Sequence, residues 1–77
     1  MTLSEALASE IRDRAHQRGM RARQVAGALD LAEISYSHRL RGEIDWRMDE
    51  LERIAALFDV NLDELFACAR ERRSDAE

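Results

Sequence analysis

The sequence has no proline and no lysine, and only three of its 77 residues are glycine. Folds built from many strands rely on proline and glycine at their turns, so this composition disfavours them. The residues that dominate instead, Ala, Leu, Arg and Glu, are strong helix formers. A chain of this length forms one domain with a small core. We therefore predict a single all-α domain.

Cysteine is equally scarce. The single thiol, Cys68, excludes an intramolecular disulfide. No apolar run is long enough to span a membrane, and the acidic N-terminus lacks the basic and apolar regions of a signal peptide. These absences predict a cytoplasmic protein without a membrane partner. Because Cys68 lies in an apolar stretch, we expect a buried structural thiol; a redox switch and a crosslink between chains are the alternatives.

Charge is unevenly distributed along the chain. The formal net charge of −4 argues against a polyanionic partner. However, residues 12–41 hold seven Arg against three acids, whereas residues 43–77 hold five Arg against eleven acids. Contact with phosphate depends on the local potential within about one Debye length, roughly 8–10 Å, more than on total charge. The first of these segments can therefore approach a nucleic acid although the molecule is acidic.

The spacing of apolar residues predicts five helices, over residues 3–17, 22–28, 33–40, 47–58 and from residue 62 onward. The side chains expected to form the core are Leu3, Leu7, Ile11, Ala15, Val25, Ala26, Leu29, Tyr36, Leu40, Met48, Leu51, Ile54, Ala55, Phe58, Leu62, Leu65, Phe66 and Ala69. From residue 70 onward no side chain is both apolar and large, so a frayed or disordered tail is expected there. The expected organisation is a domain over residues 1–69 and a charged tail over residues 70–77.

Helix ends are marked by characteristic residues. Thr2 and Glu5 have the spacing of a capping box, and Asn61 has the same spacing from Glu64. Asp45 is the expected N-cap of the fourth helix.

Chain reversals carry their own signals. Gly19 and Gly42 are expected to end the first and third helices. Asp30 lies in the short turn between the second and third helices, at a position that requires a positive φ.

The second and third predicted helices form the most informative part of the chain. Both are short and amphipathic, a tight turn joins them, and the third has apolar residues on one side only. A helix-turn-helix needs this arrangement to place its second helix in the major groove of DNA.

These residues resemble the lambda-repressor-like helix-turn-helix domains of the Cro/XRE class, over residues 3–66. The matching positions are Met20, Val25, Ala26, Leu29, Leu31, Tyr36, Gly42 and the apolar positions of LERIAALFDVNLDELF. The run SHRLRGEIDWRMDELERIAALFDV is most similar to small repressor or Cro proteins of actinobacterial phages. The resemblance implies a compact five-helix domain that binds DNA.

The chain departs from that family at three positions. Ala22 replaces the frequent Gln at the start of the second helix, which puts one DNA contact in question. Asp30 replaces the usual turn glycine. Ala32 replaces the frequent Ser or Thr cap of the third helix, at a cost of about 1 kcal/mol.

The resemblance assigns base contacts to the third helix. Glu33 and Ile34 match positions that meet base edges, where Glu accepts a hydrogen bond from cytosine N4 and Ile contacts a thymine methyl. Ser37 and His38 follow one turn later. The alternatives are an acid that favours the helix dipole for Glu33, packing at the core edge for Ile34, and a solvated polar surface for Ser37 and His38.

Phosphate contacts are expected at both ends of the helix-turn-helix. Arg21, Arg23 and Gln24 flank the start of the second helix, where the helix N-terminus attracts phosphate. Arg41 matches a phosphate-contacting position of the family, and Arg47 follows the next loop. Solvated side chains are the alternative for each.

Two large side chains near the third helix allow more than one role. Arg39 is expected to lay its methylenes on the core, project its guanidinium, and pair with Glu43 or with an acid of the fourth helix. Trp46, the only tryptophan, either covers the core or takes part in a dimer or DNA contact.

The sequence contains no Ser-His-Asp arrangement, no Gly-rich phosphate loop and no metal-ligand cluster. We therefore expect no enzyme, no cofactor and no metal site.

The expected function is that of a sequence-specific repressor whose third helix enters the major groove of double-stranded DNA. A domain this small needs a homodimer on a pseudo-palindromic site for useful affinity, with Trp46, Leu62 and Phe66 as candidate dimer residues. The alternative is a protein-interaction module on the same fold, of antitoxin or anti-repressor type, that acts through residues 43–77. Non-specific DNA binding is a third hypothesis, which the low pI disfavours.

Overall fold

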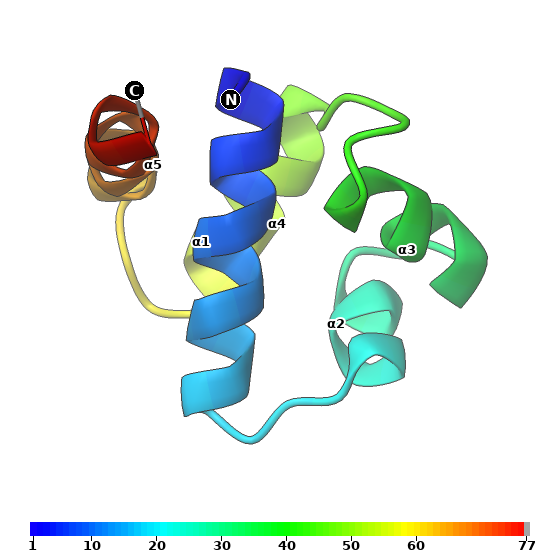
Figure 1. Cartoon of the computed structure of the whole chain (residues 1–77). Helices are drawn as coiled ribbons and strands as arrows, with labels where there is room; N and C mark the ends of the chain where they lie inside the picture. Colours follow the sequence, from blue (N-terminus) through cyan, green and yellow to red (C-terminus); the bar gives the residue numbers. More distant parts are fainter. Residues whose placement is uncertain (77) are drawn as a thin grey trace.

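A computed structural model describes residues 1–76, and within this range it contains five α-helices and no strand. The helices are α1 (Leu3–Gln17), α2 (Ala22–Ala28), α3 (Glu33–Leu40), α4 (Met48–Leu57) and α5 (Leu62–Ala76), shown in Figure 1. The all-α prediction is confirmed, and the predicted limits of the first three helices agree with the structure. None of these helices is long and apolar enough to cross a membrane.

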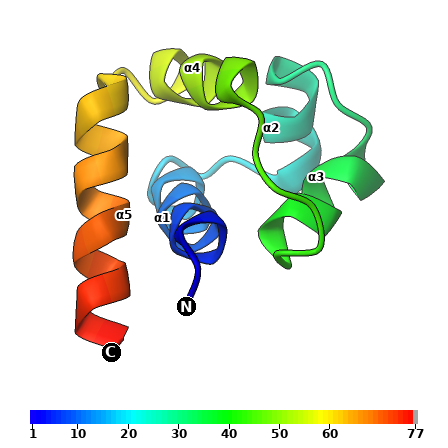
Figure 2. The same cartoon turned by 90° about the horizontal axis from the view of Figure 1, so that it is seen from above.

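Helix α1 lies at the centre of the molecule. Figures 1 and 2 show α5 along one side of α1 and the pair α2–α3 on the other, and the contacts of α1 with both α5 and α3 agree with this view. Helix α4 contacts both α2 and α5. Helix α5 and the helix-turn-helix (α2 and α3) are therefore held on opposite sides of α1.

The core is formed by the predicted apolar stripes. Its largest fully buried side chains are Tyr36, Phe58, Ile11, Leu29, Ile54, Leu65 and Val25. Leu3, Leu40, Leu62 and Phe66 pack against this core but remain partly exposed. Met48 is a correction, because 57% of it is exposed although the spacing placed it on the apolar face of the fourth helix. It is the first residue of α4, where the helix has only begun to approach the core.

The predicted signals at the helix ends of α1 and α5 are largely present. The Thr2 hydroxyl accepts a hydrogen bond from the Glu5 amide, and the Glu5 carboxylate accepts one from the Thr2 amide. The Asn61 side chain accepts a hydrogen bond from the Glu64 amide.

Positive φ angles occur at the three predicted chain reversals. Gly19 has φ +64°, Asp30 has φ +58° and Gly42 has φ +77°. Asp59 also adopts a positive φ of +56°, at the end of α4. A side chain that tolerates this conformation thus marks both of the non-glycine turns.

The start of α4 differs from the prediction. Arg47, and not Asp45, occupies the N-cap position, and its amide donates a hydrogen bond to the Glu50 carboxylate at 2.9 Å. Glu50 is only 3% exposed, so it closes the helix end from the core side.

Arg39 and Cys68 also differ from expectation. Arg39 is buried, and its guanidinium turns inward to Glu50 of α4 instead of projecting into solvent. Pairing with an acid of the fourth helix was one of the two predicted options. Cys68 is only partly buried, and its sulfur lies 3.5 Å from Nη2 of Arg14, so a charged side chain adjoins the thiol.

Helix α5 continues through residues 70–76, where we expected a frayed or disordered tail. The reason is electrostatic, because the Arg72 guanidinium binds the carboxylates of Glu10 and Asp13, each at 2.6 Å. Arg72 therefore holds the second half of α5 against α1 although this segment has no large apolar side chain. Glu77 lies outside the described residues.

Candidate nucleic-acid interface

One face of α3 is turned away from the core. With 3.6 residues per turn, positions 33, 34, 37, 38 and 41 fall within an arc of about 140°. Tyr36, Arg39 and Leu40 occupy the opposite side and pack inward. Since α3 lies at the edge of the molecule in both views, this outer face has no other helix over it (Figures 1 and 2).

All four predicted base-contacting residues lie on this outer face. Glu33 and Ile34 are exposed, and Ile34 has 60% of its surface open to solvent. Ser37 and His38 are partly exposed. A large apolar side chain so exposed beside polar ones suits contact with thymine methyl groups between hydrogen-bonding bases. These solvent-facing positions leave the four side chains available to a ligand.

The start of α2 is organised by Gln24. Its side-chain oxygen accepts a hydrogen bond from the Arg21 amide at 2.7 Å, and this bond closes the helix end. Arg21 and Arg23 are exposed on either side. The amide NH₂ of Gln24 keeps its donor capacity for a phosphate. The predicted role of Gln24 is therefore compatible with a capping role that the sequence did not reveal.

The end of α3 carries a small ionic cluster. The Glu43 carboxylate lies 3.4 Å from Nε of Arg41 and 3.7 Å from Nε2 of His38. Arg47, further along, pairs with Asp49 at 3.5 Å. Arg41 and Arg47 are both well exposed, so each can exchange its carboxylate for a phosphate.

The seven Arg of residues 12–41 are not all available to a ligand. Arg39 is buried, and the partly buried Arg14 binds Glu10. The Arg12 guanidinium donates to the carbonyl of Leu40 at 3.3 Å. Arg18 donates to the carbonyl of Phe58, and its guanidinium lies over the Phe58 ring. Four of the seven arginines therefore have structural contacts. The cationic surface at the helix-turn-helix is therefore smaller than the sequence count suggests and depends on Arg21, Arg23 and Arg41.

A buried ion pair joins α3 to α4. Nε of Arg39 donates to Glu50 of α4 at 2.8 Å, and Nη1 donates to the carbonyl of Ser35 within α3 at 3.1 Å. Tyr36 meets Trp46 edge-on, with ring centroids 6.1 Å apart. Burial raises the pKa of the Tyr36 phenol above its ordinary value, an effect that the Arg12 guanidinium opposes. Sequence reasoning offered an acid of the fourth helix as a partner for Arg39 but did not identify Glu50 as that acid.

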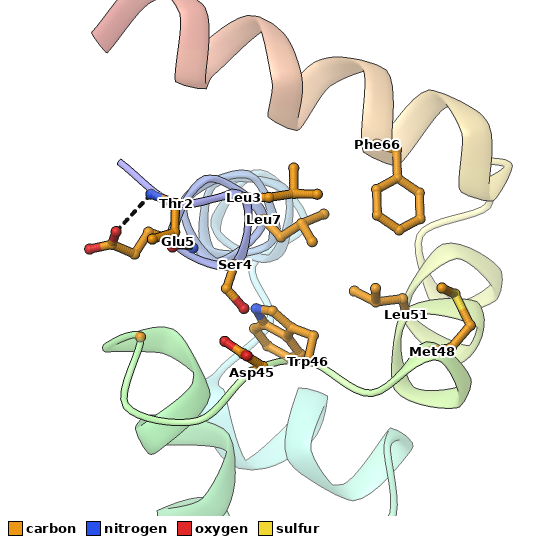
Figure 3. Close-up of a pocket in the computed structure, with 11 residues that line it drawn as sticks. Thr2, Leu3, Ser4, Glu5, Leu7, Asp45, Trp46, Met48, Leu51 and Phe66 are labelled. Carbon is orange, nitrogen blue, oxygen red and sulfur yellow. Dashed lines mark hydrogen bonds between the residues drawn. The ribbon is translucent and has the colours of Figure 1, made fainter. Parts of the chain in front are cut away.

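A separate concave surface lies between the N-terminus of α1, the loop before α4, and α5 (Figure 3). Its volume is about 640 Å³, and its lining includes Trp46 and Phe66 but not the third candidate dimer residue, Leu62. Trp46 is buried and covers the core, which was one of its two expected roles. Its indole nitrogen has no hydrogen-bond partner among residues 1–76 and points toward Ser4 in Figure 3. The exposed Met48 adds an apolar edge to this surface.

In the part of the chain that the structure describes, no three His, Cys, Asp or Glu side chains are grouped so that they could hold a metal ion.

The family model of the BetR domain matches the chain over residues 2–75. This domain is a helix-turn-helix DNA-binding domain, and the match indicates a DNA-binding transcriptional regulator that is not an enzyme. No curated protein and no solved structure matches the chain.

Proposed function

The chain belongs to the BetR domain family, and on this premise we propose that it is a sequence-specific repressor that inserts α3 into the major groove of DNA. Glu33, Ile34, Ser37 and His38 read base edges in this proposal. Arg21, Arg23, Gln24, Arg41 and Arg47 hold the phosphates on either side. The resemblance to the Cro/XRE class and to phage repressors is part of the same proposal, as is a cytoplasmic location beside the DNA.

The observation that carries this proposal is the exposure of the outer face of α3. Its polar side chains surround the 60%-exposed Ile34, and no helix of residues 1–76 covers them. Base edges in the major groove offer both thymine methyl groups for Ile34 and hydrogen-bonding partners for the polar side chains around it.

The proposal includes a homodimer on a pseudo-palindromic operator. One α3 is eight residues long and buries little DNA surface by itself, so a second copy is needed for tight binding. The surface lined by Trp46 and Phe66, with the exposed Met48 at its edge, is the candidate contact between protomers. Its lining includes none of the residues on the outer face of α3.

Selection from a random double-stranded DNA library tests sequence specificity. We expect an enriched motif with two related half-sites, and binding that weakens steeply as salt is added because phosphate contacts release counterions. Recovery of no motif, together with binding that salt does not change, would contradict the proposal. In a separate binding experiment, capture of a basic protein through residues 43–77 would favour the alternative, an interaction module.

A charge-reversal variant tests the phosphate contacts. The triple change Arg21→Glu, Arg23→Glu and Arg41→Glu is expected to weaken DNA binding at least 100-fold. Arg70→Glu is the control for a single charge reversal, since Arg70 is exposed on α5 at the other side of α1. If Arg70→Glu caused one third of the triple variant's loss in binding free energy, the loss would depend on net charge alone.

A further inference from the structure

The acid that follows α3 touches two of the side chains assigned to DNA. Glu43 lies 3.4 Å from Arg41 and 3.7 Å from His38, measured between side-chain oxygen and nitrogen atoms. All three side chains are open to solvent, with exposed fractions of 54% for Arg41, 53% for Glu43 and 36% for His38. The carboxylate therefore occupies the place beside these two donors that a DNA oxygen would need.

The backbone fixes Glu43 in this place. Gly42, with φ +77°, reverses the chain, and its amide donates to the carbonyl of Arg39 at 3.1 Å. The Glu43 amide donates to the carbonyl of His38 at 3.0 Å. Together these bonds form a Schellman motif, which sets residue 43 directly beside the last turn of the helix. The carboxylate is thus positioned by the end of α3.

From this geometry we propose that Glu43 competes with DNA for Arg41 and His38, and so determines the affinity and the salt dependence of binding. This inference rests on the proposed function. An exposed ion pair is weak, so DNA can displace the carboxylate. The displaced carboxylate then remains near the phosphates and opposes binding. While the Glu43 carboxylate neutralises Arg41, binding of Arg41 to a phosphate also releases fewer counterions from the DNA.

The test compares Glu43→Gln with Asp45→Asn. Both remove one negative charge from the same exposed loop, but Asp45 has no ion pair among residues 1–76. Because Asp45 also lines the candidate dimer surface, sedimentation velocity checks that both variants self-associate as the unmodified protein does. Binding to the selected operator and to a scrambled duplex is measured by fluorescence anisotropy at several salt concentrations. We expect Glu43→Gln to tighten binding roughly three- to tenfold more than Asp45→Asn does at low salt. The slope of log K against log salt should become steeper by roughly 0.5 to 1.

Removal of both partner side chains tests whether Glu43 affects DNA binding through Arg41 and His38. With Arg41→Gln and His38→Gln already present, Glu43→Gln and Asp45→Asn should change binding equally. Persistence of the extra gain in that background would overturn the proposal, as would equal effects of the two changes in the unmodified protein. If the unmodified protein binds neither duplex, the proposed function itself fails, which separates the two outcomes. Circular dichroism checks that each variant is folded.

Discussion

At the scale of single residues, the contact that most directly orients α3 is the buried pair of Arg39 and Glu50. The exposed fractions of the two side chains are 10% and 4%, and Glu50 also accepts the Arg47 amide. Breaking a buried pair from one side is costly because the remaining charge stays buried without its partner. The pair therefore links the stability of the domain to the placement of the helix proposed to read DNA.

Glu50→Gln is expected to lower the free energy of unfolding by about 2–3 kcal/mol, because Arg39 loses its counter-charge in a buried site. Urea unfolding followed by the fluorescence of Trp46, the single tryptophan, measures this loss. Glu52→Gln is the matched control, since Glu52 is exposed on the same helix, and it should change stability by less than about 0.5 kcal/mol. Equal losses in the two variants would contradict a special role for the buried pair.

At the scale of helices, two devices hold α1 and α5. The capping box of Thr2 and Glu5 closes the N-terminus of α1, and Arg72 joins α5 to α1 through Glu10 and Asp13. Both devices use charge or hydrogen bonds where the helices have little apolar surface to bury. The stability that the capping box adds should therefore depend on pH, and the stability of the end of α5 should depend on the single side chain of Arg72.

The capping box predicts a loss of stability in acid. The hydrogen bond from the Thr2 amide lowers the pKa of the Glu5 carboxyl below its ordinary value. A folded-state pKa below the unfolded value gives stability that is present above the unfolded pKa and is lost as the pH falls through the folded one. The difference in unfolding free energy between the unmodified protein and Glu5→Gln should therefore shrink toward zero in acid. A difference that stays constant with pH would exclude this role.

The contact of Arg72 predicts a small but local effect. A hydrogen bond to the Glu10 carboxylate raises the pKa of the Arg72 guanidinium, whereas its partial burial against α1 lowers that pKa. Since about a third of Arg72 remains exposed, Arg72→Gln should cost only about 1 kcal/mol of unfolding free energy. Hydrogen exchange should quicken in residues 70–76 and stay unchanged in α3. Arg70→Gln, on the same helix, should affect neither measurement.

At the scale of the whole molecule, the arrangement separates two exposed apolar side chains. Ile34 lies on the outer face of α3 and is 60% exposed, whereas Met48 lies at the groove beside Trp46 and is 57% exposed. In our proposal Ile34 contacts DNA, and Met48 contacts another copy of the chain. Similar exposure makes the two positions controls for each other.

Ile34→Glu should weaken DNA binding at least tenfold and leave self-association unchanged. Met48→Glu should weaken self-association at least tenfold, and should weaken operator binding only at protein concentrations where the dimer dissociates. Sedimentation velocity and fluorescence anisotropy measure the two properties. If both variants changed both properties equally at high protein concentration, the division between the two surfaces would be wrong.

Most of the fold could be predicted from the sequence because helix formation here depends on local patterns. Apolar spacing located α1, α2 and α3, and residues suited to positive φ located the chain reversals at Gly19, Asp30 and Gly42. The outward positions on α3 followed from the helix period and the burial of Tyr36. None of these inferences required knowledge of which helices touch.

Two of the inaccurate expectations involve contacts between distant segments. The Arg39 guanidinium was expected to project outward, although an acid of the fourth helix was one of its two predicted partners, and the end of α5 was expected to be frayed because it has no large apolar side chain. The structure supplies a carboxylate from another helix in both cases, Glu50 for Arg39 and Glu10 for Arg72. Charge pairing has no sequence period, so spacing did not single out Glu50 among the acids of the fourth helix and gave no partner for Arg72.

The sequence by itself determined the helices and their reversals, because local backbone preferences and apolar periodicity fix them. Only the tertiary structure decided which arginines remain available to a ligand, since burial and ion pairing depend on helices that meet in space. That is why the seven Arg of the basic segment divide into structural side chains on α1 and α3 and a smaller exposed set at the start of α2 and the end of α3.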